Sequence, residues 1–194
     1  MGVNTVTYLD HSFDIHQLRQ LDQILTNSIK PPLGIIQCLN ERGEQFNGLN
    51  RNSWVFEVPP EDKLLLEGYT LLDGPEGLGI YLGMRIVYIL VGARWRGFYS
   101  IESWRKVHLE IIERIGRVLG SSVAIWAPDY SLDLISEEIG EELGFTTIEE
   151  VEELFCKALG KPLSVHRIGE PVSIEDTEAE GYSTTDGWYI QRYS

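Results

Sequence analysis

One stretch of the chain, residues 104–119, constrains the fold most, because it places a helical stripe between runs that favour strands. Apolar positions three and four residues apart indicate an amphipathic helix, which has to bury its apolar face against another element. Ser100 is a candidate N-terminal cap, and Gly120 stands where a left-handed residue ends a helix. The stripe consists of Trp104, Val107, Ile111, Ile112, Ile115, Val118 and Leu119.

Runs of β-branched and aromatic residues on both sides of this helix predict a sheet. Ile80–Leu82 and Ile86–Val91 are close enough for a hairpin, and Val123–Trp126 follows the helix. Several strands adjoin in sequence without a helix between them. We therefore expect an α+β fold, with about four helices packed on a mixed, largely antiparallel sheet. The other expected strands are Thr5–Leu9, Leu33–Leu39, Trp54–Val58, Leu163–Ile168 and Trp188–Tyr193.

Three further helices complete this prediction. The first begins at a cap, Asp10 or Ser12, and ends before Pro31-Pro32. The second covers Leu132–Leu143, and the third begins at the capping box Thr147–Glu150. The stretch Asp73–Gly79 is expected to be a loop. A chain of 194 residues without internal repeats indicates one globular domain, residues 1–194.

The chain shows no signal for secretion or for crossing a membrane. Its first residues lack a basic region followed by an apolar core. The longest apolar run, Ile80–Ala93, is interrupted by Arg85 and is shorter than the ~20 residues of a spanning helix. The two cysteines, Cys38 and Cys156, are expected to be buried, reduced thiols. We therefore expect a soluble protein of the cytoplasm.

Negative charge is the strongest functional signal in the sequence. The formal net charge is −14, and residues 118–194 hold 16 acidic and 4 basic residues. Such a field repels the phosphates of nucleic acids and anionic membranes, and it attracts basic proteins. The sequence thus predicts a basic protein partner, no nucleic acid and no membrane; it leaves the oligomeric state open.

Two segments concentrate the acidic residues. In the helix Leu132–Leu143 no basic residue offsets the acids, whereas Glu149 and Glu150 suit a helix start and Glu153 can pair with Lys157. The stretch Gly169–Gly187 is expected to be a mobile acidic loop. Both segments are either solvated surface or docking surface for a partner. The residues predicted to bind the partner are Glu137, Glu138, Glu141, Glu142, Glu175, Asp176, Glu178 and Glu180.

A short basic segment, Arg94-Trp95-Arg96, precedes Gly97-Phe98-Tyr99. Arginine beside aromatic residues is typical of interface hot spots, so these three residues join the predicted partner-binding set. The alternative is intramolecular: the arginines pair with the acidic helices, and Trp95 belongs to the core.

No motif names a reaction. Gly74–Gly79 lacks the lysine of a phosphate-binding loop, and no nucleophile elbow occurs. His11 and His16 are spaced too poorly for two metal ligands on one helix face, and we expect no cofactor, metal or catalytic residue. His108 is expected to be half-buried and hydrogen-bonded. In size, acidity and lack of motifs the chain resembles bacterial toxin-neutralising immunity proteins in general character, which assigns no residue a role.

The leading hypothesis is a non-enzymatic acidic protein that docks a basic protein partner, as an inhibitor or an immunity-type neutraliser does. Two alternatives remain open. One is a hydrolase-like enzyme whose histidines and carboxylates are scattered in sequence, with His11, Asp14, His16 and His108 as its members. The other is a subunit of an oligomeric assembly that uses Arg94–Tyr99 as its contact.

Overall fold

The computed structural model confirms the α+β class. It describes residues 4–58, 60–61, 70–139, 146–165, 168 and 187–193, and of residues 92–94, 96, 99–100 and 136–139 it describes the backbone alone. The strands form one eight-stranded sheet in the order β2-β3-β4-β5-β1-β6-β8-β7. Neighbouring strands are antiparallel except β7 and β8, which are parallel. The sheet is therefore mixed and largely antiparallel, as the sequence predicts.

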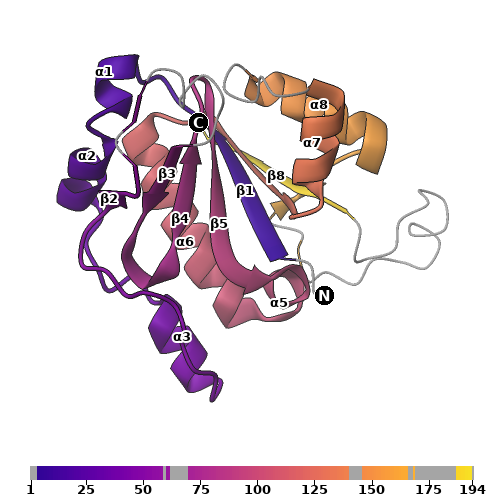
Figure 1. The fold of residues 1–194 in the computed structure, drawn as a ribbon. Helices are drawn as coiled ribbons and strands as arrows, with labels where there is room; N and C mark the ends of the chain where they lie inside the picture. Colours follow the sequence, from indigo (N-terminus) through magenta and orange to yellow (C-terminus); the bar gives the residue numbers. More distant parts are fainter. Residues whose placement is uncertain are drawn as a thin grey trace.

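The elements of the sheet and its helices follow one another along the chain in Figure 1. The strands are β1 (Asn4–Asp10), β2 (Val55–Phe56), β3 (Thr70–Asp73), β4 (Gly79–Leu82), β5 (Ile86–Arg94), β6 (Val123–Pro128), β7 (Leu163–Ser164) and β8 (Tyr189–Arg192). The helices are α1 (Ile15–Leu18), α2 (Leu21–Ser28), α3 (Ile35–Glu41), the 3₁₀ turn η1 (Pro75–Gly77), α5 (Trp95–Ser100), α6 (Glu102–Leu119), α7 (Ser131–Ile139) and α8 (Ile148–Leu159).

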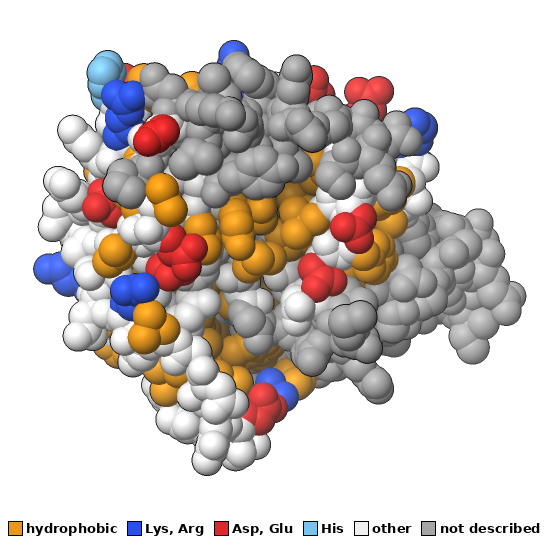
Figure 2. Space-filling model, viewed as in Figure 1, with side chains coloured by type: hydrophobic (Ala, Val, Ile, Leu, Met, Phe, Trp, Pro, Cys, Tyr) orange, Lys and Arg blue, Asp and Glu red, His pale blue; other side chains and the backbone are white. Residues whose placement is uncertain are grey.

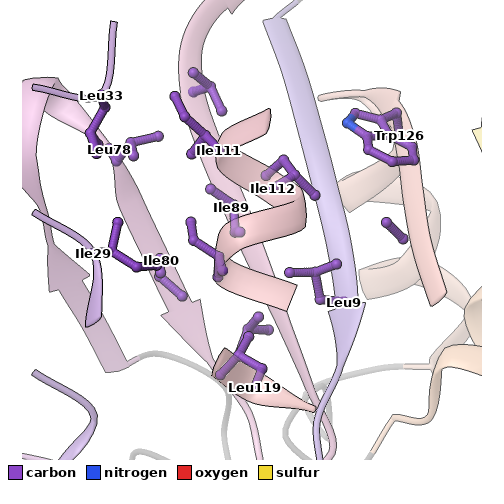
Figure 3. Close-up of a cluster of buried hydrophobic side chains, with 14 of the residues drawn as sticks. Leu9, Ile29, Leu33, Leu78, Ile80, Ile89, Ile111, Ile112, Leu119 and Trp126 are labelled. Atoms are coloured by element: carbon purple, nitrogen blue, oxygen red, sulfur yellow. The ribbon is translucent and has the colours of Figure 1, made fainter. Parts of the chain in front are cut away.

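Helix α6 packs against one face of the sheet and organises the larger core. Side chains alternate between the two faces of a strand, so Leu9, Ile80, Ile89 and Trp126 all reach this side. Ile111 and Ile112 of α6 point at these strands in Figure 3. Helices α1, α2, α3 and α5 complete the same layer. This first face is buried by the helical stripe that the sequence predicts.

Helices α7 and α8 pack on the second face of the sheet. Here Val6 and Tyr8 of β1 and Ile125 of β6 contact Val151 and Phe155 of α8. The ring of Phe155 meets that of Tyr8 edge to face, with 5.5 Å between their centroids. In Figure 1 α6 lies behind the strands, whereas α7 and α8 lie in front of them. The central strands are therefore enclosed between two layers of helices.

Several predicted elements are confirmed. The chain has the strand β1, the antiparallel hairpin of β4 and β5, and the helix α6 ending at Gly120 in left-handed conformation. The capping box of α8 is present: Thr147 accepts from the Glu150 amide, and Glu150 accepts from the Thr147 amide. Each of these segments combines a clear hydrophobic period with a local start or stop signal.

Three local predictions are wrong, and the first is the Ser100 cap, because Ser100 ends α5 and Ile101 precedes α6. Leu33–Leu39 lies mostly in helix α3 and forms no strand, because Gly34 at φ 96° begins a helix. The first helix is capped by Asp14, whose carboxylate accepts from the amides of His16 and Gln17. Neither Asp10 nor Ser12 serves as that cap. The predicted loop Asp73–Gly79 contains the turn η1, and Thr70–Asp73 forms a strand that was not predicted.

Asp10 instead ties the end of β1 to the start of β6. Its carboxylate accepts hydrogen bonds from the hydroxyls of Ser121 and Ser122, at 2.6 and 2.7 Å, and from the amides of Ser122 and Val123. Burial raises the pKa of Asp10, but these hydrogen bonds outweigh burial and hold its pKa below the usual value. Asp10 thus anchors the connection between α6 and β6.

Glu76 makes a second tie, between η1 and α3. Its side chain is buried, and its carboxylate accepts from the amides of Leu33 at 2.6 Å and Ile36 at 3.0 Å. Its backbone has φ 55°, a left-handed conformation that costs a residue other than glycine free energy. The Glu76 amide donates to Asn50 Oδ1 at 3.3 Å. A strained backbone persists here because the carboxylate stabilises the start of α3.

The Glu76→Ala variant should be destabilised by about 2–4 kcal/mol, since it leaves the amides of Leu33 and Ile36 without their acceptor. Glu76→Gln keeps one acceptor oxygen and should lose less than half of that amount. Urea unfolding followed by circular dichroism measures both values. Equal stabilities of the two variants and the original protein would contradict the assigned role of the carboxylate.

Candidate functional site

Most of the acidic residues predicted to bind a partner lie outside the described residues. Glu137 and Glu138 are in the last turn of α7, where the backbone alone is described. Glu141, Glu142, Glu175, Asp176, Glu178 and Glu180 lie outside the described residues, as does the predicted mobile loop up to residue 186. Their part in docking stays a prediction.

Of the basic segment, only Trp95 has a described side chain. Arg94 ends β5 and Arg96 lies in α5, and only their backbones are described. Trp95 is 3% exposed, stacks on Phe98 with 5.7 Å between the ring centroids, and lies 5.8 Å from the Tyr189 ring. Trp95 is therefore a core residue, as the intramolecular alternative has it, and its side chain offers no surface to a partner.

Helix α8 presents an acidic face to solvent in the described part of the chain. Glu149 and Glu153 are exposed, and no hydrogen bond or ion pair to another described residue engages their carboxylates. The predicted pair of Glu153 with Lys157 does not form. Glu152 is neutralised by Arg192 at 2.6 Å, and Glu150 serves the capping box. Two adjacent turns of α8 thus carry negative charge that no ion pair between described residues neutralises.

On the second face of the sheet, the described helices cover only one half. The covered half comprises β1, β6, β8 and the start of β5 at Ile86, under α7 and α8. The other half, which we call the bare half, consists of the side chains of Leu71, Tyr81, Tyr88 and Leu90 on β3, β4 and β5. All four are half-buried; Tyr88 and Leu90 pack at the edge of the second core cluster, whereas Leu71 and Tyr81 belong to neither cluster of described side chains. Figure 2 shows hydrophobic side chains gathered in the middle of this face.

A row of cross-strand neighbours joins the two halves. Leu71 faces Tyr81, Tyr81 faces Tyr88, and Tyr88 faces Tyr8 in successive strands. The rings of Tyr81 and Tyr88 are parallel within 5° and their centroids are 4.6 Å apart. Tyr8 is fully buried, and its hydroxyl forms a hydrogen bond of 2.9 Å with the Ser131 hydroxyl. Burial raises the pKa of Tyr8. The row is rigid at its covered end and partly open at the other.

A hollow of about 410 Å³ lies at the edge of the bare half. Gly79 faces Leu90 across the β4–β5 pair, so this position has no side chain to fill the surface. Around it stand Leu71, Tyr81, Leu90 and Leu49, which is 63% exposed. Arg51 and Asp73 line the hollow as well and pair with each other at 3.3 Å. The hollow therefore has apolar walls and a self-neutralised polar edge.

A second cleft, of about 600 Å³, lies beside α3. Pro31, Pro32 and Ile36 form apolar walls, and the other lining residues are carboxamides and carboxylates. The carboxylate of Glu76 faces this cleft but is engaged by backbone amides, and Glu41 accepts from Gln37 at 2.9 Å. Gln37, Glu41, Asn50 and Glu76 therefore already have partners within the fold. The polar lining consists of Gln37, Asn40, Glu41, Asn50, Asn52 and Glu76.

The residues proposed for an enzyme do not converge in the structure. Asp14 caps α1, and His16 lies exposed in the same helix. His11 Nε2 lies 3.0 Å from the carbonyl oxygen of Gly83. His108 is fully buried between Trp104 and Phe98, and neither ring nitrogen has a hydrogen-bond partner among the described residues. The expectation of a half-buried, hydrogen-bonded His108 is therefore wrong.

Within the described ranges, no three His, Cys, Asp or Glu side chains come together as metal ligands. Both cysteines are free; Cys38 is buried as expected, whereas Cys156 on α8 is exposed. None of the described helices is long and apolar enough to span a bilayer. Comparisons with protein-family models, curated proteins and solved structures found no match to this chain. Its function has to be argued from its own residues.

Sequence reasoning missed the bare half and its hollow. The signal was present, because Ile86–Val91 is apolar at every position and a strand with two apolar faces needs cover on both. The hairpin partner offers Tyr81 on the same side. What the sequence could not show is that the second core cluster ends on β5 and includes no described residue of β3 or β4.

The burial of His108 predicts a specific loss of stability in acid. Burial lowers the pKa of His108 from 6.5 to about 3 in the folded protein. Above pH 6.5 both states are neutral there and the histidine has no effect. Below pH 6.5 His108 binds a proton in the unfolded chain but stays neutral in the folded chain. The free energy of unfolding therefore falls as the pH drops toward 3, by up to about 1.4 kcal/mol per pH unit.

The His108→Leu variant should lose this part of the pH dependence and unfold at the same denaturant concentration as the original near pH 7, or at a higher one. Denaturant midpoints between pH 4 and 7 measure the difference in slope. An unchanged slope in the variant would mean that His108 is not the group responsible.

Proposed function

We propose that this protein is a non-enzymatic binding protein that docks a basic protein partner through the acidic side of its second helical layer. The observation that carries the proposal is the acidic face of α8, where Glu149 and Glu153 are exposed and without ion pairs in the described part of the chain. A folded protein that only needed solubility has no requirement to concentrate charge on one layer.

The net charge of the chain also supports a basic partner. The chain carries a net charge of −14, and residues 118–194 hold 16 acids against 4 bases. Charges of opposite sign speed the encounter of two proteins and select among partners. The basic residues described near α8, such as Arg192, already neutralise one of its acids. The excess negative charge is therefore available to a partner, and an inhibitor or neutraliser gains most from rapid capture.

The contact is expected to include α7 as well as α8. Asp133 is exposed on α7, and Glu137 and Glu138 follow in the same helix. The two helices pack side by side on one face of the sheet. A partner that docks on α8 is therefore expected to contact α7 as well.

Affinity capture from a native lysate tests the proposal, first at low salt and then with a wash at high salt. A basic protein should bind at low salt and be released at high salt, because screening weakens exposed charge pairs. Bound proteins that are acidic, or that stay bound regardless of salt, would contradict the electrostatic basis.

The double variant Glu149→Lys with Glu153→Lys should associate with the captured partner at least about tenfold more slowly. Its melting temperature should fall by no more than a few degrees, since only the favourable charge in the first turn of α8 is lost. The matched control is Asp22→Lys with Glu110→Lys, which changes the same number of charges on α2 and α6. Equal slowing by the control would show that net charge alone matters.

A further inference from the structure

We propose that the bare half is the hydrophobic centre of the docking surface, and that the basic partner inserts an apolar side chain into the hollow above Gly79. This inference rests on the proposed function and deepens it, because it names the second recognition element of the partner. That partner combines lysines or arginines with a large aliphatic or aromatic anchor at the centre of its own surface.

The geometry of the bare half suits an anchor. Protein interfaces have an apolar centre, and the residues that carry most of the binding energy are often tyrosines packed around a pocket. Tyr81 and Tyr88 stack on each other and continue a row that is buried at Tyr8. Because the buried end fixes the row, little conformational entropy remains to be lost when a partner packs on its open end.

The missing side chain at Gly79 makes the hollow. Leu90 lies across the strand pair on one side of this glycine, and Asp73 lies across on the other. The volume of about 410 Å³ accepts a leucine or an aromatic side chain of the partner. Arg51 and Asp73 neutralise each other at the edge, so the hollow itself favours apolar groups. The preference for a basic partner comes from charged residues outside the hollow.

The charge around the bare half identifies the kind of occupant. Figure 2 shows Asp and Glu side chains on both sides of the hydrophobic area, with Lys and Arg side chains near those on the left. On the covered side the neighbouring helix is α7, whose Ser131 contacts Tyr8 and whose Asp133 is exposed. An anchor that reaches the hollow is therefore best carried by a surface with basic residues around it.

The same charge argues against a second copy of this chain. Two copies meeting at this face would bring together two acidic borders and two net charges of −14. Repulsion of that kind opposes association. We therefore commit to a different protein of basic character as the occupant.

The test uses synthetic peptides of one length in which four lysines flank a single central residue, either leucine or alanine. Binding to the full chain is measured by isothermal titration calorimetry, and the amide signals of the protein are followed by NMR. The leucine peptide should bind about tenfold more tightly than the alanine peptide at equal charge. Its signal shifts should centre on Gly79, Tyr81, Tyr88 and Leu90.

The Gly79→Val variant should remove the advantage of leucine while leaving the alanine peptide unaffected. Gly79 lies in a strand and outside the left-handed region, and an added Cβ would lie 3.4 Å from Leu71 Cδ1, so valine fits the strand and fills the hollow. The matched control is Gly187→Val, where the added Cβ would lie 3.9 Å from another leucine carbon, Leu163 Cδ1. This control should bind both peptides as the original does.

Equal binding of the two peptides to the original protein would overturn the inference, as would signal shifts confined to other elements. So would a concentration-dependent dimer that Gly79→Val dissolves, since the occupant would then be a second copy. The NMR shifts decide the question even if Gly79→Val does not fold.

The double variant Glu149→Lys with Glu153→Lys separates this inference from the proposed function. It should weaken both peptides by the same factor and leave their ratio at about ten. If the peptides bind equally but both respond to the charge reversal, the hollow is not an anchor site and the electrostatic proposal stands. If only the leucine peptide binds and the charge reversal has no effect, the electrostatic proposal fails.

Discussion

The central strands β1, β5 and β6 carry apolar side chains on both of their faces, and the need to bury both faces shapes the rest of this protein. Leu9, Val87 and Trp126 face one layer, while Tyr8, Ile86 and Ile125 face the other. A sheet of this kind requires helices on both sides. The amphipathic helix α6 meets the requirement on the first side, and α7 with α8 meets it on the second.

Two buried or half-buried carboxylates tie segments of the fold that are distant in sequence. Asp10 fixes the chain that leaves α6 and enters β6, through hydrogen bonds from Ser121, Ser122 and Val123. Glu76 fixes the start of α3 against η1, beside strands β3 and β4. Both carboxylates accept hydrogen bonds from groups within the fold. The acids of α8 differ from them, since Glu149 and Glu153 contribute no such bond in the described part of the chain.

The sequence predicts the elements with strong periodicity, and it fails where local geometry decides. The apolar stripe of α6 and the capping box of α8 predict their helices. Two runs of β-branched residues a few positions apart predict the hairpin of β4 and β5. Leu33–Leu39 was mistaken for a strand because its apolar residues form a run without a helical period, whereas Gly34 and the Glu76 carboxylate begin a helix there. Glu76 is 43 residues away from Leu33 in sequence, so no local pattern reveals the contact.

The candidate site was predictable in its charge and hidden in its shape. The sequence identifies the acidic C-terminal part, although it assigns Glu153 to a pair with Lys157 that does not form. It gives no sign that Gly79 leaves a hollow beside two stacked tyrosines, because that follows from the pairing of β3, β4 and β5. Trp95 shows the converse: its neighbours suggested an exposed hot spot, and the fold places it between Phe98 and Tyr189.

We propose that the acidic helical layer and the half-covered sheet face together dock a basic protein. Hydrogen–deuterium exchange of the protein, with and without the partner captured from the lysate, tests this most directly. If this proposal holds, exchange slows in the β4–β5 hairpin, α7 and α8 and does not change in α6 on the opposite layer. Slower exchange in α6 alone, or no change in any of these segments, would contradict it.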